Sequence, residues 1–218
     1  MLDIIKKRHC QRAFLDQAVP KKLLENILLS AGNAASSKNS QPWQVAVLQG
    51  HSKDSLIQDM CEQFDSDRLG KPDYQYMTDP MPEIFKTRAR ECGYGLYQLK
   101  QISRDDHDAR RQHFRENYTF FGAPVGLIFH LHSDAERGNF LDMGLFMQNI
   151  MLGLVSEGLG SCPQFSITMA SDLIRQHLNL GSDRMIVCGM AVGYPTSSDI
   201  NMYIPERLPL SEYVQWFD

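Results

Sequence analysis

Residues 36–43 read SSKNSQPW, and an apolar run, VAVL, follows at residues 45–48. The run has the length of a β-strand and stops at Gly50, so residues 43–48 predict a buried strand preceded by a polar loop. Serine, asparagine and glutamine side chains therefore crowd the entrance of that strand. A buried strand does not by itself need so many hydrogen-bonding groups in front of it, which makes the loop a candidate for binding a polar ligand.

The spacing of apolar residues outward from this loop predicts helices that alternate with a few short strands. A short helix at the N-terminus and a helix from Pro20 to about Gly32 precede the loop. After it we expect a polar helix at 52–69, an irregular segment with prolines and tyrosines at 70–82, a helix at 83–102 that continues on the surface through 104–117, a strand at 124–131, a central buried helix at 138–159, a short strand at 161–167, a small helix at 170–178, a strand at 185–192 and a last short helix from 209. This pattern predicts an α+β protein with a small central mixed sheet surrounded by helices. No repeat or linker divides it, so we expect one domain over residues 1–218.

Composition and charge are those of an ordinary globular protein. Hydrophobic residues make up 43% of the 218 residues, charged residues make up 22%, and the net charge is −4. This charge gives no reason to expect nucleic acid or an anionic membrane as partner, and no apolar run approaches the ~20 residues that span a bilayer. The five cysteines show no CxxC spacing, and the first ten residues do not resemble a secretory signal, so we expect a cytoplasmic protein.

Three short segments are candidate binding elements. The segment RHCQR, residues 8–12, places three potential cations within five residues. A guanidinium suits a phosphate because its planar fork makes two parallel charge-assisted hydrogen bonds. Arg207 lies near the C-terminus, and CPQ, residues 162–164, follows a glycine-containing helix end where backbone amides could face a ligand. Each segment has a plain alternative: a solvated basic patch, a surface arginine, and a simple turn into a strand.

Other chemical signatures are weak or absent. The sequence contains no GxGxxG, P-loop, GxSxG or HExxH motif. His130 and His132 alternate along a predicted strand, but no third ligand has suitable spacing, so we predict no metal site. Met143, Met147 and Met151 share one helix face and are explained by core packing. Asp142 on the same helix stays unassigned.

Taken in order along the chain, these elements resemble the nitroreductase family of FMN-dependent flavoproteins. The family pattern has an R-x-x-x-R segment after the first helix, an SSxNxQPW loop before the first strand, a long central helix leading to a short strand with Pro-x-x, a near-terminal apolar strand ending in Gly-Tyr, and a terminal arginine. Here these are RHCQR, SSKNSQPW, CPQF, the Val-Gly-Tyr of residues 192–194, and Arg207. The stretches FFGAPVGLIF and FMQNIML, and the loop at 72–82, are similar to the nitroaromatic and nitrobenzoate reductases of that family.

The resemblance implies a nitroreductase-like fold and an intertwined homodimer with two FMN sites at its interface. Arg8 and Arg207 would hold the phosphate, and Arg12 would lie near the N1/O2 edge of the flavin. The polar loop would reach the flavin held mainly by the other subunit. The implied cofactor-binding residues are Arg8, His9, Cys10, Arg12, Ser36, Ser37, Asn39, Gln41, Pro163, Gln164, Phe165, Gly189 and Arg207. Pro205 and Phe165 depart from the family pattern, because some members carry a basic and an acidic residue there.

The resemblance also implies the reaction. NADH or NADPH would give a hydride to FMN, and a small nitroaromatic or quinone-like acceptor would then take its place in a ping-pong cycle. Because FMN would carry the chemistry, no catalytic side chain is expected. Aromatic residues in two segments that read as irregular suggest substrate contacts from Tyr74, Tyr76, Met77, Phe120 and Phe121.

Three alternatives remain open at the level of the sequence. One is another flavin reaction on the same scaffold, such as reductive dehalogenation, flavin destruction or enone/azoline oxidoreduction. The second is a flavin-binding protein without catalytic activity, and the third is a metal-binding module that uses His130 and His132. The choice between NADH and NADPH is also open, because no residue that would read a ribose phosphate is evident.

Overall fold

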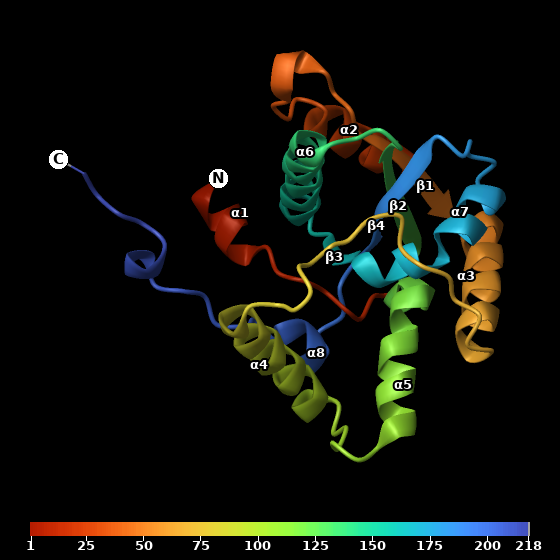
Figure 1. The fold of residues 1–218 in the computed structure, drawn as a ribbon, viewed down its shortest axis with the longest axis vertical. Helices are drawn as coiled ribbons and strands as arrows, with labels where there is room; N and C mark the ends of the chain where they lie inside the picture. Colours follow the sequence, from red (N-terminus) through yellow and green to blue (C-terminus); the bar gives the residue numbers. More distant parts are fainter. Residues whose placement is uncertain (218) are drawn as a thin grey trace.

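The computed structural model describes residues 1–217, and its centre is a four-stranded sheet in the order β1-β2-β4-β3 (Figure 1). The strands are β1 (Gln44–Gln49), β2 (Val125–His132), β3 (Gly160–Gln164) and β4 (Arg184–Gly193). They lie close to the predicted positions. The predicted α+β class, with helices around a small sheet, is confirmed.

The sheet is antiparallel, so the prediction of a mixed sheet is wrong for the described strands. The helical connection from β2 to β3 does make those two strands point in the same direction. However, β4 lies between them and runs opposite to both. One parallel pairing, between Cys10 and Ser161, is an isolated bridge outside the strands.

Side chains alternate between the two faces of the sheet, and each face is covered by its own helices. On β2, Leu127 and Phe129 join an apolar cluster with α2 (Lys21–Ala31) and α6 (Arg137–Ser156). Ile128 points the other way. The second cluster is built with the helices α3 (Gly50–Asp65) and α7 (Ser171–His177) and the 3-10 segments η2 (Glu116–Gly122) and η3 (Phe165–Ala170). Figure 1 shows α2 and α6 on one side of the sheet and α3 and α7 on the other.

The remaining elements lie around this core. They are α1 (Leu2–Lys7), α4 (Glu83–Leu99), α5 (His107–Arg115), α8 (Asp199–Met202) and the 3-10 turns η1 (Ser37–Asn39) and η4 (Leu210–Glu212). The predicted continuation of a helix through 104–117 is wrong in one respect. The Asp106 side chain accepts a hydrogen bond from the Ala109 amide at 2.9 Å and starts α5 as a new helix. In the described part of the chain, no helix has both the length and the apolar composition needed to cross a membrane.

Two elements are less buried than predicted. β1 is an edge strand in which Leu48 is buried while Val47 is 40% exposed. The central helix α6 buries one side against the sheet, but Leu141 and Leu145 are 68% and 42% exposed. A single chain therefore leaves apolar surface uncovered at both places.

Candidate functional site

The N-terminal arginine segment lies beside β3. Cys10 forms the isolated bridge with Ser161, and the Gln11 amide donates a hydrogen bond to the Ser161 carbonyl oxygen at 3.0 Å. This pairing holds the segment that carries Arg8 and Arg12 against β3, whose last three residues are CPQ. Two of the predicted binding segments are therefore adjacent in space.

Asn201, which no sequence motif singles out, connects the arginine segment to the C-terminal region. Its Oδ1 accepts hydrogen bonds from the amides of Arg12 and Ala13 at 2.6 and 3.1 Å. Its Nδ2 donates to the carbonyl oxygens of Ala13 and Thr196 at 2.6 and 3.0 Å. Asn201 is 3% exposed and stands 189 residues along the chain from Arg12, so only the folded structure reveals it.

Three arginines in this region carry charges without a carboxylate partner. Arg8 and Arg12 are half-buried, and Arg207 is exposed. Within residues 1–217, no ion pair with any of the three lies within 4.0 Å. Arg207 also lines a groove of about 1230 Å³ between α4 and the C-terminal segment. Such free guanidinium groups are suited to bind a phosphate.

The thiol of Cys10 lies in this positive environment. A hydrogen bond from Cys162 lowers the pKa of Cys10, and the guanidinium groups of Arg12 and Arg8 add to the effect against the opposing influence of burial. The shared hydrogen bond and burial raise the pKa of Cys162 well above its usual value. The two shifts have opposite directions, so ionisation is favoured at Cys10 and disfavoured at Cys162.

Aromatic residues of the irregular segment cover the start of η3. Phe165 stacks on Tyr76 with ring centroids 4.4 Å apart and meets Tyr74 edge-on at 5.7 Å. The Tyr74 hydroxyl donates to the Val187 carbonyl oxygen at 2.8 Å, which ties residues 70–82 to β4. Burial raises the pKa of Tyr74. Two of the predicted substrate residues thus lie beside the predicted flavin-binding turn, and Met77 next to them is 48% exposed.

Gln164 keeps a buried acceptor without a partner. The residue is 2% exposed, and its Nε2 donates to the Asn117 carbonyl oxygen at 2.5 Å. Its Oε1 has no hydrogen-bond partner among the described residues. Buried polar atoms without a partner are rare in folded proteins and point to a missing group. The half-buried Pro163 and Phe165 flank this position.

Core packing accounts for three other predicted site residues. Phe120 is completely buried, and a Cβ added at Gly126 would lie 2.8 Å from its ring. The predicted substrate contact is therefore wrong for Phe120, because η2 turns its ring into the core. Phe121 packs against the apolar cluster that contains Phe120, on the side of the sheet covered by α3 and α7. Gly189 packs closely against Ile167, since a Cβ there would lie 2.4 Å from Cδ1 of Ile167.

The SSKNSQPW loop forms a tight turn at the opposite end of α6. The Gln41 amide donates to Ser36 Oγ at 3.0 Å. Lys38, Asn39 and Gln41 have φ angles of 52°, 56° and 45°. Non-glycine residues rarely adopt this left-handed region, and residues that do so cluster at functional sites.

Asp142 fixes this loop to the second turn of α6. Its Oδ1 accepts a hydrogen bond from the Ser37 amide at 3.4 Å, while Oδ2 is buried without a partner. At 1.5 Å per residue, about 21 Å of helix separates Asp142 from the end of α6 at Ser156, and β3 begins only beyond that end. Figure 1 shows the turn after α2 toward one end of α6 and β3 toward the other. One chain therefore does not bring the predicted loop residues to the arginine segment.

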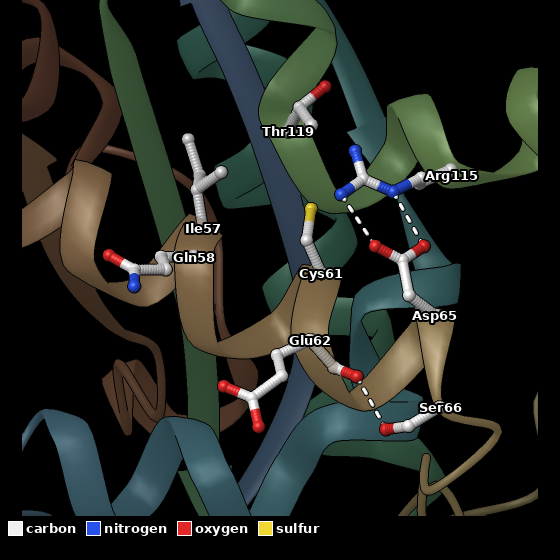
Figure 2. Close-up of a pocket in the computed structure, with 8 residues that line it drawn as sticks. All are labelled: Ile57, Gln58, Cys61, Glu62, Asp65, Ser66, Arg115 and Thr119. Carbon is white, nitrogen blue, oxygen red and sulfur yellow. Dashed lines mark hydrogen bonds and ion pairs between the residues drawn. The ribbon is translucent and has the colours of Figure 1, made fainter.

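A separate hollow of about 620 Å³ lies between α3 and the α5–η2 region (Figure 2). Arg115 donates hydrogen bonds at 2.8 Å to each carboxylate oxygen of Asp65, and this contact lowers the pKa of Asp65. Figure 2 shows Cys61 and Thr119 beside this ion pair. None of the predicted site residues lines the hollow, and its charged residues are paired, Arg115 with Asp65 and Glu62 with Arg68. It is a junction between helices and is distinct from the candidate site.

The two histidines of β2 lie in different surroundings. The strand is irregular between Phe129 and His130. His130 is 5% exposed, and burial lowers its pKa, whereas the His132 side chain is 53% exposed. Across residues 1–217, no group of three or more histidine, cysteine or acidic side chains is arranged to hold a metal ion.

Several known proteins with similar sequences and structures are named as nitroreductases. The model of the nitroreductase family matches residues 5–194. The chain is 35% identical over 213 residues to the chloronitrobenzene nitroreductase of Comamonas testosteroni, covering 97% of this chain and 94% of the relative. It is 36% identical over 191 residues to a 4-nitrobenzoate reductase of Pseudomonas putida, covering 88% and 83%. The crystal structure of the FMN and NADPH-dependent nitroreductase NfnB from Sphigopyxis sp. strain HMH matches with a TM-score of 0.95 at 32% identity, over 100% of this chain and 98% of that one. The chain belongs to the nitroreductase family, as its sequence motifs implied.

Proposed function

We propose that this protein is an FMN-dependent NAD(P)H oxidoreductase that reduces nitroaromatic compounds. The relatives reported above are named for nitroarene and nitrobenzoate reduction, and the NfnB structure is named for its dependence on FMN and NADPH. The observation that carries the proposal to this chain is that Arg8 and Arg12, on the segment paired with β3, and Arg207, on the C-terminal segment, have no ion-pair partner among the described residues. A phosphate-bearing cofactor would supply the missing negative charge.

The residues around β3 suit FMN. Arg8 and Arg207 would hold the phosphate, and neither forms an ion pair within the described chain, although Glu91, Glu206 and Glu212 line the same groove as Arg207. Gln164 offers a buried acceptor without a partner, and the rim of a flavin carries both donors and acceptors. Arg12 adds a half-buried positive charge, which favours negative charge on a bound ring.

When bound, FMN would supply the hydride-transfer chemistry that links a nicotinamide to a nitro compound. The protein's own residues would bind and orient the reactants. Tyr76 and Phe165 present a stacked aromatic pair to a flat acceptor, and the hydrogen bond of Tyr74 to β4 holds that pair in place. A structure with a bound nitroarene that lacks contacts from Tyr74, Tyr76 and Met77 would reject this substrate assignment.

We also propose that the active form is a homodimer in which the loop Ser36–Gln41 completes the site of the other subunit. About 21 Å of α6 separates the loop from the arginine segment within one chain. Large apolar side chains are exposed on α1, on α6 and near the C-terminus, among them Leu2, Leu141 and Trp216, which are 73%, 68% and 81% exposed. A second copy of the chain would bury this surface and bring the loop to the opposite site.

An absorption spectrum of the purified protein tests the cofactor. Bound oxidised flavin gives maxima near ~450 nm and ~370 nm. Anaerobic addition of NADH and, separately, NADPH should bleach the longer-wavelength band and show which donor is preferred. A colourless protein that does not take up added FMN would refute the proposal.

Turnover assays separate the alternatives. Steady-state rates with 4-nitrobenzoate, a quinone and a halogenated phenol distinguish nitroreduction from dehalogenation and other flavin reactions. A yellow protein whose flavin neither nicotinamide bleaches would be a binding protein without this activity. All five cysteines are free thiols, so a reducing compartment such as the cytoplasm suits the chain, and this location stays a prediction. The single domain over residues 1–218 also stays a prediction.

A further inference from the structure

The arginines proposed to hold the phosphate lie on two segments without helical or strand structure. Residues 8–20 and residues 203–209 contain no helix or strand apart from isolated bridges. The backbone of such segments is positioned by hydrogen bonds to other parts of the fold. The geometry of the phosphate site therefore depends on whatever joins these two segments.

The Asn201 side chain makes that connection. It accepts two backbone amides, from Arg12 and Ala13, and donates to two carbonyl oxygens, of Ala13 and Thr196. A side-chain amide has one acceptor oxygen and two donor hydrogens, so these four bonds use its full capacity. At 3% exposure, water has little access to replace a lost bond.

His9 strengthens the same connection from the other side. Its Nε2 lies 2.7 Å from the Asn201 carbonyl oxygen, and its Nδ1 lies 2.7 Å from the Lys7 carbonyl oxygen. The side-chain Nε2 of Gln11 lies 2.8 Å from His9 Nε2. Backbone and side chain of Asn201 are thus both tied to the arginine segment, on either side of Cys10.

We infer that Asn201 is a positioning residue for the phosphate-binding arginines. It acts on the backbone of the arginine segment and anchors the start of the C-terminal segment that carries Arg207, so its role does not require contact with the ligand. This inference rests on the proposed function, because it assumes that these arginines bind the phosphate of FMN. Without Asn201, both guanidinium groups would have to be ordered by the ligand itself, which weakens binding.

Comparing FMN with riboflavin isolates this effect, because riboflavin lacks the phosphate. We expect Asn201→Ala to weaken FMN binding roughly tenfold, as for loss of a charge-assisted hydrogen bond, and to leave riboflavin binding within about twofold. Asn201→Ser adds no charge, keeps a short polar side chain and loses the bonds of the amide, so it serves if the alanine variant does not fold. It should also lose preference for FMN over riboflavin.

Two further variants make the outcome decisive. Asn149→Ala is the matched control, because Asn149 is a half-buried asparagine on α6 whose side chain makes one hydrogen bond among the described residues, from Nδ2 to the Ala31 carbonyl oxygen at 3.4 Å. Equal losses of FMN and riboflavin in the Asn201 variants, or no loss of either, would overturn the inference. Arg8→Ala tests the site itself: if it keeps the preference for FMN, the proposed phosphate site is wrong. If Arg8→Ala loses the preference and the Asn201 variants keep it, only the positioning role fails.

Discussion

At the scale of single residues, Arg8 carries the most direct prediction about the cofactor. Replacing it with alanine should remove a charge-assisted contact worth roughly 1.5–3 kcal/mol and weaken FMN binding about tenfold or more. Fluorescence titration of the flavin-free protein with FMN measures the change. Arg90→Ala is the control, because Arg90 is an exposed residue of α4 that pairs with Glu83 at 3.3 Å. Unchanged FMN affinity in Arg8→Ala protein would contradict the phosphate assignment.

Cys10 carries a prediction about pH. Its pKa is lowered to about 5, mainly by the hydrogen bond from Cys162. Because the thiolate is the nucleophile, and a lowered pKa keeps it ionised above about pH 5, the flavin-free protein should be alkylated by iodoacetamide at nearly the same rate at pH 6 and pH 8. An ordinary thiol would instead react faster as the pH rises through its pKa near 8.5. Mass spectrometry of the modified peptide follows the rate.

Cys10→Ser protein is the control for this measurement, because the fast modification should disappear. Bound FMN should slow the alkylation of Cys10 if the phosphate lies beside Cys10, as proposed. A rate at Cys10 that rises about tenfold per pH unit between pH 6 and 8 would show an ordinary thiol and reject the prediction.

The sequence predicted site residues only where they belong to a short local sequence motif. Arg8, Arg12 and Gln164 stand in short motifs whose order along the chain is recognisable, and the structure pairs the segment that carries the two arginines with β3, which ends at Gln164. Asn201 has its partners at the other end of the chain, and Asp142 shows its link to the polar loop only through a buried amide contact. Long-range hydrogen bonds of this kind leave no periodicity in the sequence.

At the scale of the elements, apolar spacing predicted nearly every helix and strand, and the failures have local causes. The break before α5 depends on a single cap at Asp106. Composition alone could not show that β1 is an edge strand, because an apolar run reads the same at the edge and at the centre of a sheet. Phe120 and Phe121 have φ angles of 50° and 52°, which bulky residues rarely adopt. The sequence does not reveal such backbone angles, so it predicts a loop position for Phe120, which the structure places in the core.

The packing of Phe120 on β2 predicts the effect of a small substitution. In Gly126→Ala protein, the new methyl group would lie 2.8 Å from a ring that is completely buried. Overpacking of a dense core costs about 1–3 kcal/mol, so the unfolding free energy should fall by that amount in denaturant titrations. The double variant Gly126→Ala/Phe120→Leu should be more stable than the sum of its two single changes implies.

The matched control is Gly138→Ala on α6, where an added Cβ meets no atom within 4 Å. Because alanine favours a helix over glycine, this change should leave stability unaltered or slightly higher. If Gly126→Ala protein is as stable as the wild type, the ring does not pack as described.

At the scale of the whole molecule, the chain separates two halves of one proposed site. The polar loop and Asp142 lie near the start of α6, whereas the arginine segment and β3 lie beyond its end. Exposed apolar residues on α1, α6 and the C-terminal segment mark the surface through which two copies could join these halves. This arrangement predicts that each flavin needs residues from both subunits.

Mixed dimers test that prediction directly. One variant would carry Arg8→Ala and Arg207→Ala with an intact loop, and the other Ser37→Ala and Asn39→Ala with intact arginines. If sites are shared, a mixed dimer has one site with both defects and one with none, so it should bind half the FMN of the wild-type dimer at wild-type affinity. Each homodimer should bind FMN weakly at both sites.

The opposite result would follow if each subunit held its flavin alone. Every site of a mixed dimer would then carry one of the two defects, and no site of wild-type affinity would appear. Co-expression with two different affinity tags isolates the mixed dimer, and equilibrium dialysis counts the bound FMN. A wild-type subunit paired with the double-arginine variant provides the reference, because this dimer retains one intact site under either arrangement. Only the mixed dimer of the two variants therefore distinguishes a site shared between subunits from a site formed by one subunit.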